Sequence, residues 1–462
     1  MPIPLFTLVS ILVLAQSAPG MTALSAGGLE GRPSAEAASP LQARIDRAAP
    51  GATIDVGPGV YRGDVYLERP VRLVGHGRPM LLGSGQGSVI RIRAADVLVE
   101  GFDIDGRMGG SLVNDSSGIH VAAARATIKD VRIVQTFFGI YLREADGATV
   151  EHSTIRGKPG IDPGEQGSGL HVYDTEDFRL VDNDIADVRD GIYIQSSNGG
   201  TVRGNVARRL RYGLHYMYSD DNVFEDNRFE DGAAGAALMY SRHIAFRRNR
   251  FLHNRGFASV GLLLKDCEDV VAEDNLIADN ARGLFLEGST RNEFRRNVIA
   301  VSDVALVLFD SSRNTVFEGN AFIANQSPLE LVGHRTDTRF EGNYWSDADE
   351  PDLDGDGVRD RPYRISSVFD HLRGNLTAAE LFAQGPAARA LGAAERTFPV
   401  LRPASVEDRH PLARAPRLPD VPVTIAAQGG MRVLGLGTAL AVIGAGAWAI
   451  VWGRRTRRGA AA

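Results

Sequence analysis

Cysteine is almost missing from this chain: Cys267 is the only one among 462 residues. A disulfide needs two cysteines, so an internal disulfide framework is excluded, while export from the cytoplasm is not. The simplest interpretation of Cys267 is a small residue at a bend of the chain.

A basic stripe is also missing. The chain has 51 Lys and Arg residues against 57 Asp and Glu residues, for a net charge of -6. Without a concentrated positive surface, nucleic acid is not expected as a partner. The chain also lacks a phosphate-binding loop, a nucleophile elbow and paired zinc ligands, so the sequence offers no motif for several common enzyme classes.

What the chain does contain is a repeat, marked by two kinds of anchor residue. One anchor is a small residue followed by an apolar, variable, apolar triplet, at Gly118, Gly139, Gly169, Gly191, Gly213, Gly235, Gly261, Gly283, Ala305 and Pro328. The other is an Asn with an apolar residue close behind it, at Asn183, Asn205, Asn227, Asn249, Asn275, Asn297, Asn320 and Asn343. Most intervals are 22 or 23 residues. A fixed period of this size indicates stacked units.

Each repeat contains three short apolar segments, with Gly and Asn at the bends where left-handed backbone is needed. This pattern predicts an all-β fold, a right-handed parallel β-helix of ~22-residue turns with three short strands per turn, over residues 40–346. Helical repeats need 33 or more residues, and a leucine-rich solenoid needs Leu at fixed offsets that the chain does not have.

The N-terminus is expected to contain a signal peptide over residues 1–26, because Leu5 to Ala15 is an apolar run followed by small residues, although no Lys or Arg precedes it. Residues 27–39 are expected to form a linker. Ser39 and Pro40 then indicate an N-cap and a first helical residue, and predict a short helix from Leu41 to Ala48. Such a helix would cover the first open strand edge of the solenoid.

An Asp-rich stretch over residues 347–365 follows the last repeat, and is expected to close the solenoid. Its carboxylates alternate around a Gly, as in the first half of a calcium loop, which makes calcium a candidate structural ion on Asp352, Asp354, Asp356 and Asp360. Tyr363 stands where an EF-hand has its bidentate Glu, so the motif is incomplete. A solvated acidic turn remains the alternative.

Residues 366–430 are expected to form a Pro-rich arm that contains one short helix opened by a capping box. Residues 433–452 are an uncharged apolar run of bilayer-spanning length, and arginines follow at once. Because positive residues stay in the cytoplasm, the run predicts a C-terminal transmembrane helix, a cytoplasmic tail over 453–462 and a β-helix held in the periplasm.

Several motifs resemble the NosD family: the run from Tyr212 to Asn222, the Gly-Asn turns at Gly319 and Gly342, and the Asp-Leu-Asp-Gly-Asp-Gly block before Pro362. The resemblance extends from about Leu41 to Pro411. It implies an exported β-helix that serves maturation of nitrous oxide reductase. The implied partners are an ABC transporter, with an ATPase and a permease of the NosF and NosY type, and a copper-carrying lipoprotein of the NosL type. The membrane segment departs from the plain exported subunit of that family.

Strand alternation sends residues one and three places after each small anchor inward, and residues two and four places after it outward. The outward column two places after the anchor predicts a partner-docking face, made of His120, Tyr141, His171, Tyr193, Leu263, Phe285 and Val307. Apolar residues stacked on adjacent turns indicate a docking patch. Alternatively, a loop or the C-terminal arm covers them.

The same face predicts a transient copper(I) site on His215, Met217 and Met239. The two methionines stand one turn apart in one column, so their backbones should lie ~4.8 Å apart. Thioether sulfur selects copper(I), and imidazole is a compatible ligand. The alternative is a recognition surface, because Met and Tyr also pack well at interfaces.

Other parallel β-helices modify polysaccharides, and their grooves need paired carboxylates for acid and base work. Here Asp and Glu collect at the bends, and the outward columns are nearly free of them. The sequence therefore predicts a copper-site assembly factor that is not an enzyme, with a polysaccharide-binding or polysaccharide-modifying protein of the lyase or epimerase type as the alternative. A purely structural adhesin is a third possibility, because fold alone does not decide function.

Overall fold

The computed structural model describes residues 39–111, 116–256, 258–333, 336–365 and 406–416. The predicted signal peptide, most of the predicted linker, the short helix of the arm, the predicted membrane helix over 433–452 and the basic tail lie outside these residues. Within the described residues, no helix is both long enough and apolar enough to cross a bilayer.

The described chain begins with helix α2 (Pro40–Arg47), within one residue of its predicted position. Ser39 is its N-cap, and its hydroxyl accepts a hydrogen bond from the amide of Gln42 at 3.2 Å. The Gln42 side chain then pairs with the backbone of Tyr66, accepting from its N–H at 2.8 Å and donating to its C=O at 3.0 Å. The Gln42 amide therefore takes the place of a neighbouring strand at Tyr66, and the role of the helix as a cap stays a prediction.

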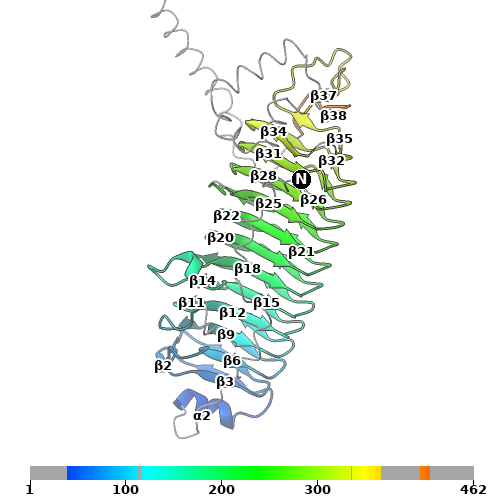
Figure 1. The fold of residues 1–462 in the computed structure, drawn as a ribbon. Helices are drawn as coiled ribbons and strands as arrows, with labels where there is room; N and C mark the ends of the chain where they lie inside the picture. The colour runs from blue at the N-terminus through cyan, green and yellow to red at the C-terminus, as the bar shows by residue number, and fades with distance from the viewer. Residues whose placement is uncertain (1–38, 112–115, 257, 334–335, 366–405, 417–462) are drawn as a thin grey trace, which may run out of the picture.

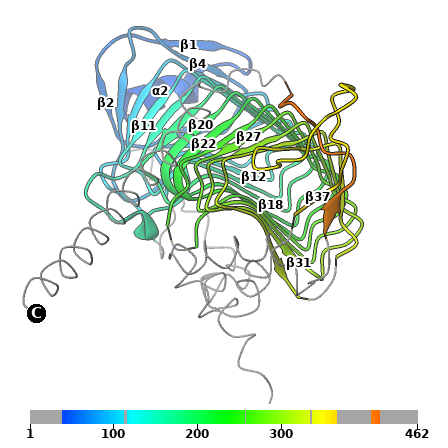
Figure 2. The same cartoon turned by 90° about the horizontal axis from the view of Figure 1, so that it is seen from above.

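The rest of the described chain is a parallel β-solenoid of right-handed type with about 13 turns, as the sequence predicted. Figure 1 shows the turns stacked along one axis, and Figure 2 looks down that axis. Each complete turn contributes one strand to each of three faces. The first face is a 15-stranded sheet, and the other two faces are joined in a 23-stranded sheet.

The strands of the first face precede the Asn anchors. They are β1 (Thr53–Val56), β4 (Arg72–Gly75), β7 (Leu98–Glu100), β10 (Thr127–Lys129), β13 (Thr149–Glu151), β16 (Arg179–Val181), β19 (Thr201–Arg203), β21 (Val223–Glu225), β23 (Ala245–Arg247), β26 (Val271–Glu273), β29 (Glu293–Arg295), β32 (Val316–Glu318), β35 (Arg339–Glu341), β37 (Tyr363–Arg364) and β38 (Glu407–Asp408). All pair in parallel except β37 with β38.

The strands of the second face follow the Asn anchors. They are β2 (Val60–Arg62), β5 (Met80–Leu82), β8 (Asp103–Asp105), β11 (Arg132–Val134), β14 (Thr154–Arg156), β17 (Asp184–Ala186), β24 (Arg250–Leu252), β27 (Leu276–Ala278), β30 (Val298–Ala300), β33 (Ala321–Ile323) and β36 (Tyr344–Trp345).

The third face carries the small anchors: from Gly118 onward, each of its strands contains an anchor or begins directly after one. Its strands are β3 (Val65–Leu67), β6 (Ile90–Ile92), β9 (Ser117–Val121), β12 (Phe138–Arg143), β15 (Leu170–Tyr173), β18 (Asp190–Gln195), β25 (Val260–Lys265), β28 (Arg282–Glu287), β31 (Val304–Phe309) and β34 (Ser327–Val332). Two 12-residue strands, β20 (Val206–Met217) and β22 (Arg228–Met239), run through the second and third faces and join them. A 3-10 helix, η2 (Pro163–Glu165), lies in the insertion between β14 and β15.

The core lies inside the coil, where alternate residues of all three faces meet. Leu284 and Leu286 on β28 are fully buried, as predicted from strand alternation. Phenylalanines at equivalent positions stack on one another, with ring centroids 4.6 Å apart for Phe294 and Phe317 and 5.0 Å apart for Phe317 and Phe340. One continuous apolar core therefore extends through the whole solenoid.

The recurring asparagines form a buried ladder beside this core. In each step the side-chain Oδ1 of one Asn accepts from the backbone N–H and the Nδ2 of the Asn one turn before, as Asn227 Oδ1 does from Asn205 at 3.0 Å each. The Nδ2 group also donates to a strand carbonyl, which for Asn205 is that of Leu180. The ladder runs through Asn183, Asn205, Asn227, Asn249, Asn275, Asn297, Asn320 and Asn343.

A second ladder uses hydroxyl groups at the bend after the third face. The Ser219 hydroxyl accepts from the N–H of Ser197, and the Ser241 hydroxyl accepts from the N–H of Ser219. Cys267 takes the serine position in the next turn, where its N–H donates to the Ser289 hydroxyl at 3.1 Å. Burial raises the pKa of the Cys267 thiol to about 12, so the thiol stays protonated. The interpretation of Cys267 as a small residue at a bend is confirmed.

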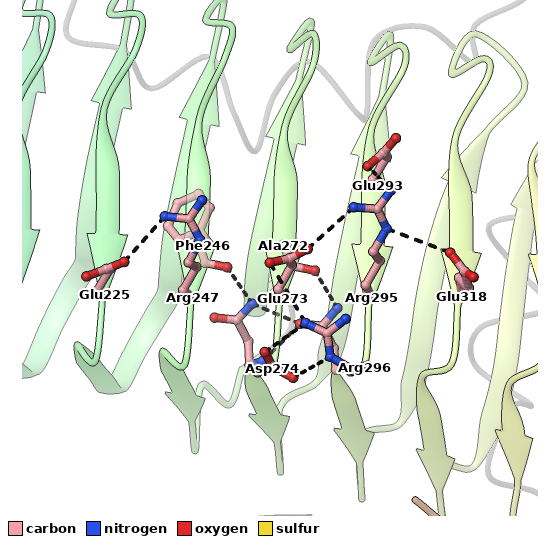
Figure 3. Close-up of polar contacts among 12 residues, drawn as sticks. Glu225, Phe246, Arg247, Ala272, Glu273, Asp274, Glu293, Arg295, Arg296 and Glu318 are labelled. Carbon is pink, nitrogen blue, oxygen red and sulfur yellow. Dashed lines mark hydrogen bonds and ion pairs between the residues drawn. The ribbon is translucent and has the colours of Figure 1, made fainter.

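The outer side of the first face carries alternating charges (Figure 3). Arg247 on β23 lies 3.3 Å from Glu225 on β21. Further along, Arg295 lies 3.4 Å from Glu273 and 3.7 Å from Glu318. These pairs are partly exposed, so each contributes at most about 1 kcal/mol to stability. Because the charges cancel between neighbouring turns, this face offers no single-sign surface to a partner.

The C-terminal end of the solenoid is closed by residues that were expected to belong to an extended arm. Strand β38 adds to β35 in parallel, and the buried Asp408 takes the place of the next Asn in the ladder. Its Oδ2 accepts from the N–H and Nδ2 of Asn343 at 2.9 and 3.0 Å, and from the Trp345 indole N–H at 3.1 Å. The described part of the predicted arm is therefore part of the solenoid, because the last Asn needs an acceptor.

Replacing Asp408 by Ala should destabilise this end of the molecule. The change leaves three buried donors of Asn343 and Trp345 without an acceptor, at a cost on the order of 2 kcal/mol or more. We expect a lower Tm and faster hydrogen exchange at the amides of Gly342 and Asn343, with β1 to β10 unaffected. Asp408→Asn retains one acceptor oxygen and should lie between the wild type and Asp408→Ala. Equal exchange in all three proteins would show that the carboxylate does not hold the end of the ladder.

Candidate functional site

On the third face, the residues predicted to form one outward column are direct neighbours from turn to turn. The strand registers pair Tyr141 with His120 and His171, then Tyr193 with His171 and His215. The rings touch in sequence: the centroids lie 5.1 Å apart for His120 and Tyr141, 4.5 Å for Tyr141 and His171, 4.4 Å for His171 and Tyr193, and 4.9 Å for Tyr193 and His215. The alignment inferred from the repeat is therefore correct across five consecutive turns.

The exposure inferred for this column is wrong. His171 and Tyr193 are only 6% and 7% exposed, and Leu263 and Val307 are 5% and 2% exposed. The physical reason is visible at His171, whose ring contacts those of Phe138, Tyr141 and Tyr193. Large side chains stacked at strand spacing hide one another from solvent, although they point away from the core.

The apolar part of the column forms a cluster of its own, outside the main core. Ala237 and Leu263 are buried together, with Met239, Tyr212 and Phe285 packed against them. Strand pairing continues the column through Leu263, Phe285 and Val307 in register. The predicted apolar stretch therefore exists as one contiguous group, and its role as a docking face stays a prediction.

The two histidines deep in the column are neutral at physiological pH. Burial, together with the charges of Arg91 and Arg143, lowers the pKa of His120 to about 4, and burial lowers that of His171 to about 3. Among the described residues, His120 Nε2 and His171 Nδ1 are buried without a hydrogen-bond partner. Both rings therefore act as packing groups that carry an unused polar atom.

His215 differs from these two histidines because a carboxylate holds it. The Nδ1 atom of His215 lies 3.2 Å from Oδ2 of the buried Asp190, which also forms two hydrogen bonds with Arg211 at 2.9 and 2.7 Å. Burial alone would raise the pKa of Asp190, but the hydrogen bonds and charges of His215 and Arg211 outweigh it and hold the pKa below its ordinary value. The carboxylate favours the proton on Nδ1, which leaves the lone pair of Nε2 for a ligand.

The two methionines stand beside this histidine. Met217 is two residues after His215 on β20 and on the same side of the strand, and β22 places Met239 directly opposite Met217. Both methionines are partly buried. Lys265, the next residue in this column, pairs with Glu287 at 2.8 Å. The structure therefore brings His215, Met217 and Met239 together at the backbone level, as the repeat predicted.

Sequence reasoning missed Asp190 and Arg211 as parts of this site. A signal was present, because Asp190 immediately precedes the anchor Gly191, and no other anchor from Gly118 to Pro328 is preceded by a carboxylate. A single carboxylate at this position of the repeat, one turn before a histidine, indicates that it binds a specific side chain of the next turn.

The Asp-rich loop brings together three of the four predicted calcium ligands. One carboxylate oxygen of each of Asp352, Asp354 and Asp356 lies within 4.8 Å of the other two. Asp360 is not part of this group, and its Oδ2 accepts a hydrogen bond from the amide of Leu353 at 2.7 Å. The carboxylates also accept from loop amides, as Asp352 does from Gly355 and Gly357. Calcium at this loop stays a prediction.

Comparison with known proteins shows which proteins this chain is similar to. The family described as periplasmic copper-binding protein (NosD) matches residues 152–350. A protein of Stutzerimonas stutzeri named probable ABC transporter binding protein NosD is 29% identical over 375 residues, covering 78% of this chain and 86% of its own length. A Pseudomonas aeruginosa protein of the same name is also 29% identical, over 411 residues, covering 78% and 87%. The resemblance to the NosD family is confirmed.

Solved structures similar to this chain show its fold alone. An alginate lyase, AlyF-OU02, is 12% identical with a TM-score of 0.53, covering 67% of this chain and 83% of its own. A second alginate lyase, of family PL6, is 13% identical with a TM-score of 0.52, covering 65% and 81%. At such low identity the activity of these enzymes does not transfer to this chain.

The buried histidines make the stability of this solenoid depend on pH. An unfolded chain protonates His near pH 6.5, whereas the folded chain does so only at the lowered pKa values of about 4 and 3. Between these values the unfolded state binds more protons, so stability is fully present above about pH 6.5 and is lost as the pH falls toward 4. His171→Phe keeps the ring stack and removes one such group. When the pH is lowered from about 7 to about 4.5, the Tm of both proteins should fall. The fall should be several degrees smaller for His171→Phe than for the wild type.

The matched control is His152→Phe, because the His152 side chain is 53% exposed. This variant should show the pH dependence of the wild type. If His171→Phe and His152→Phe give the same curve as the wild type, the buried ring does not set the pH dependence.

Proposed function

We propose that this protein is a periplasmic accessory factor for assembly of the copper sites of nitrous oxide reductase, and not an enzyme. The name of its relatives supports an association with an ABC transporter, and the family description supports copper and the periplasm. In this proposal an ATPase and a permease of the NosF and NosY type and a lipoprotein of the NosL type are its partners. Residues 433–452 anchor it in the inner membrane.

The observation that carries the proposal is the group formed by His215, Met217 and Met239. All three lie within residues 152–350, which match the family. Two thioethers and one imidazole suit copper(I), which prefers soft ligands and low coordination numbers. A site with so few ligands also gives up its metal readily, as delivery to another protein requires.

The charges around the group are compatible with a bound cation. The Arg211 guanidinium lies 3.4 Å from His215 Nδ1, and Asp190 neutralises its charge. Lys265 is likewise neutralised by Glu287. Asp190 also orients the imidazole from the side away from the metal, which is the usual arrangement for a histidine ligand.

A polysaccharide-modifying activity finds less support. Lyases and epimerases need catalytic side chains on an open groove, whereas His171 and Tyr193 in the middle of this column are nearly buried. The buried carboxylate in this region, Asp190, is already bound by Arg211 and His215. Incubation with alginate and an assay for unsaturated products test this alternative directly.

The copper site predicts a specific loss of affinity. Copper(I) titrated against a competing chelator should bind the wild type with a Kd at least about tenfold lower than the variant with Met217→Leu and Met239→Leu, because leucine keeps the packing and removes the sulfur ligands. Maturation of nitrous oxide reductase in cells should fall in parallel. The control is Met80→Leu on β5, which should leave both measurements unchanged.

Two outcomes of this titration separate the alternatives. If the double variant binds copper(I) as tightly as the wild type, the metal site is elsewhere. If copper binding is unchanged but maturation still fails, the methionines contribute to recognition of a partner instead.

The Asp-rich loop gives a second metal prediction, for a calcium ion that stabilises the C-terminal end. Three carboxylates this close repel one another unless a cation lies among them. Chelation should therefore lower the Tm of the wild type by a few degrees and hardly change that of the variant with Asp354→Ala and Asp356→Ala. An equal response of both proteins to chelator would mean that the loop is only an acidic turn.

A further inference from the structure

Two exposed tyrosines follow the methionine pair, at the bend where the third face ends. Tyr218 and Tyr240 are 55% and 43% exposed. Their rings stack face to face, with centroids 5.0 Å apart and planes within 8° of parallel. Exposed large apolar side chains are few in the described part of the chain, and these two stack on each other.

The backbone at this bend is unfavourable for tyrosine. Tyr218 and Tyr240 have φ values of 49° and 55°, in the left-handed region, where a bulky side chain is strained. Hydrogen bonds align the bend with equivalent positions in other turns, and these are occupied by Glu144, Asp174, Ser196, Asp266 and Gly288. Two turns therefore have a strained aromatic residue where the repeat otherwise uses small or acidic residues, which indicates a function for the rings.

The surroundings of the stack are strongly acidic. The five bends over residues 174–177, 196–199, 218–221, 240–243 and 266–269 contain one arginine, one histidine and the carboxylates Asp174, Glu176, Asp177, Asp220, Asp221, Asp266, Glu268 and Asp269. The arginine, Arg242, pairs with Asp220, and Arg291 from the next bend pairs with Asp269 and Glu268. Most of the negative charge remains, so nucleic acid and anionic membrane surfaces are repelled from this bend.

We propose that Tyr218 and Tyr240 form a docking surface for a basic segment of a partner protein. Arginine and lysine side chains of that segment bind the outer faces of the two rings by cation–π contact, and the flanking carboxylates supply charge complementarity. The partner then lies one residue from Met217 and Met239. The docking surface itself does not require copper, so this inference goes beyond the proposed function and is tested separately from it.

The test uses the full-length protein without copper and a hexa-arginine peptide with blocked ends as the probe, measured by calorimetry at low salt. The wild type should bind the peptide, and the variant with Tyr218→Asn and Tyr240→Asn should bind it about tenfold more weakly, because both cation–π contacts are lost. Asparagine tolerates left-handed backbone, so this variant should have a Tm equal to or above that of the wild type.

Two controls make the result specific. The variant with Tyr218→Phe and Tyr240→Phe keeps both rings and should bind within about twofold of the wild type. Val60→Asn removes an equally exposed apolar side chain at the other end of the solenoid and should have no effect. Equal affinity of the asparagine variant and the wild type, or equal binding of a hexa-glutamate peptide, would overturn the inference. The copper(I) affinity of the asparagine variant should be unchanged, so failure here leaves the copper proposal standing.

Discussion

The buried asparagine ladder is the constraint on which the rest of this structure depends. Each Asn joins neighbouring turns through three hydrogen bonds, one donated by its main-chain N–H and two by its side-chain Nδ2, and its side chain is buried. A shift of one residue in any turn would leave buried amide groups unpaired and would send the apolar side chains to the outside. Chain length can therefore vary only outside the strands. The step from Asn249 to Asn275 contains four more residues than its neighbours, yet the ladder continues across it at 2.8 Å.

Because the ladder holds the register, residues that are 22 positions apart in sequence become direct neighbours. This effect brings Met217 next to Met239, and Tyr218 next to Tyr240, without any dedicated loop. The same register sets the character of the outer surfaces. The first face presents charges that cancel between turns, while the third face presents rings and apolar groups that cover one another. The residues that we propose to bind copper and a basic partner segment therefore lie on the third face and at the bend that follows it.

At each end of the solenoid, hydrogen-bonding groups have no further turn to pair with, and a different side chain satisfies them at each end. At the N-terminal end the Gln42 amide offers both a donor and an acceptor, and so satisfies a strand edge. At the C-terminal end the buried Asp408 carboxylate offers acceptors alone, which is what the last Asn of the ladder and the Trp345 indole need. In both cases a polar side chain satisfies hydrogen-bonding groups that the next turn would otherwise pair.

The repeat, the strand positions and the alignment of the columns follow from the sequence, since hydrophobic period and anchor residues are local properties of the chain. The pairing of Met217 with Met239 could be inferred in this way. Only the tertiary structure decided three other features. The middle of the outward column on the third face is buried because neighbouring side chains such as Phe138 pack against His171. His215 is bound by Asp190, 25 residues before it. Asp408 returns across 65 residues to close the ladder at Asn343. Each depends on side chains that meet across turns or ends of the solenoid, which periodicity in one dimension does not specify.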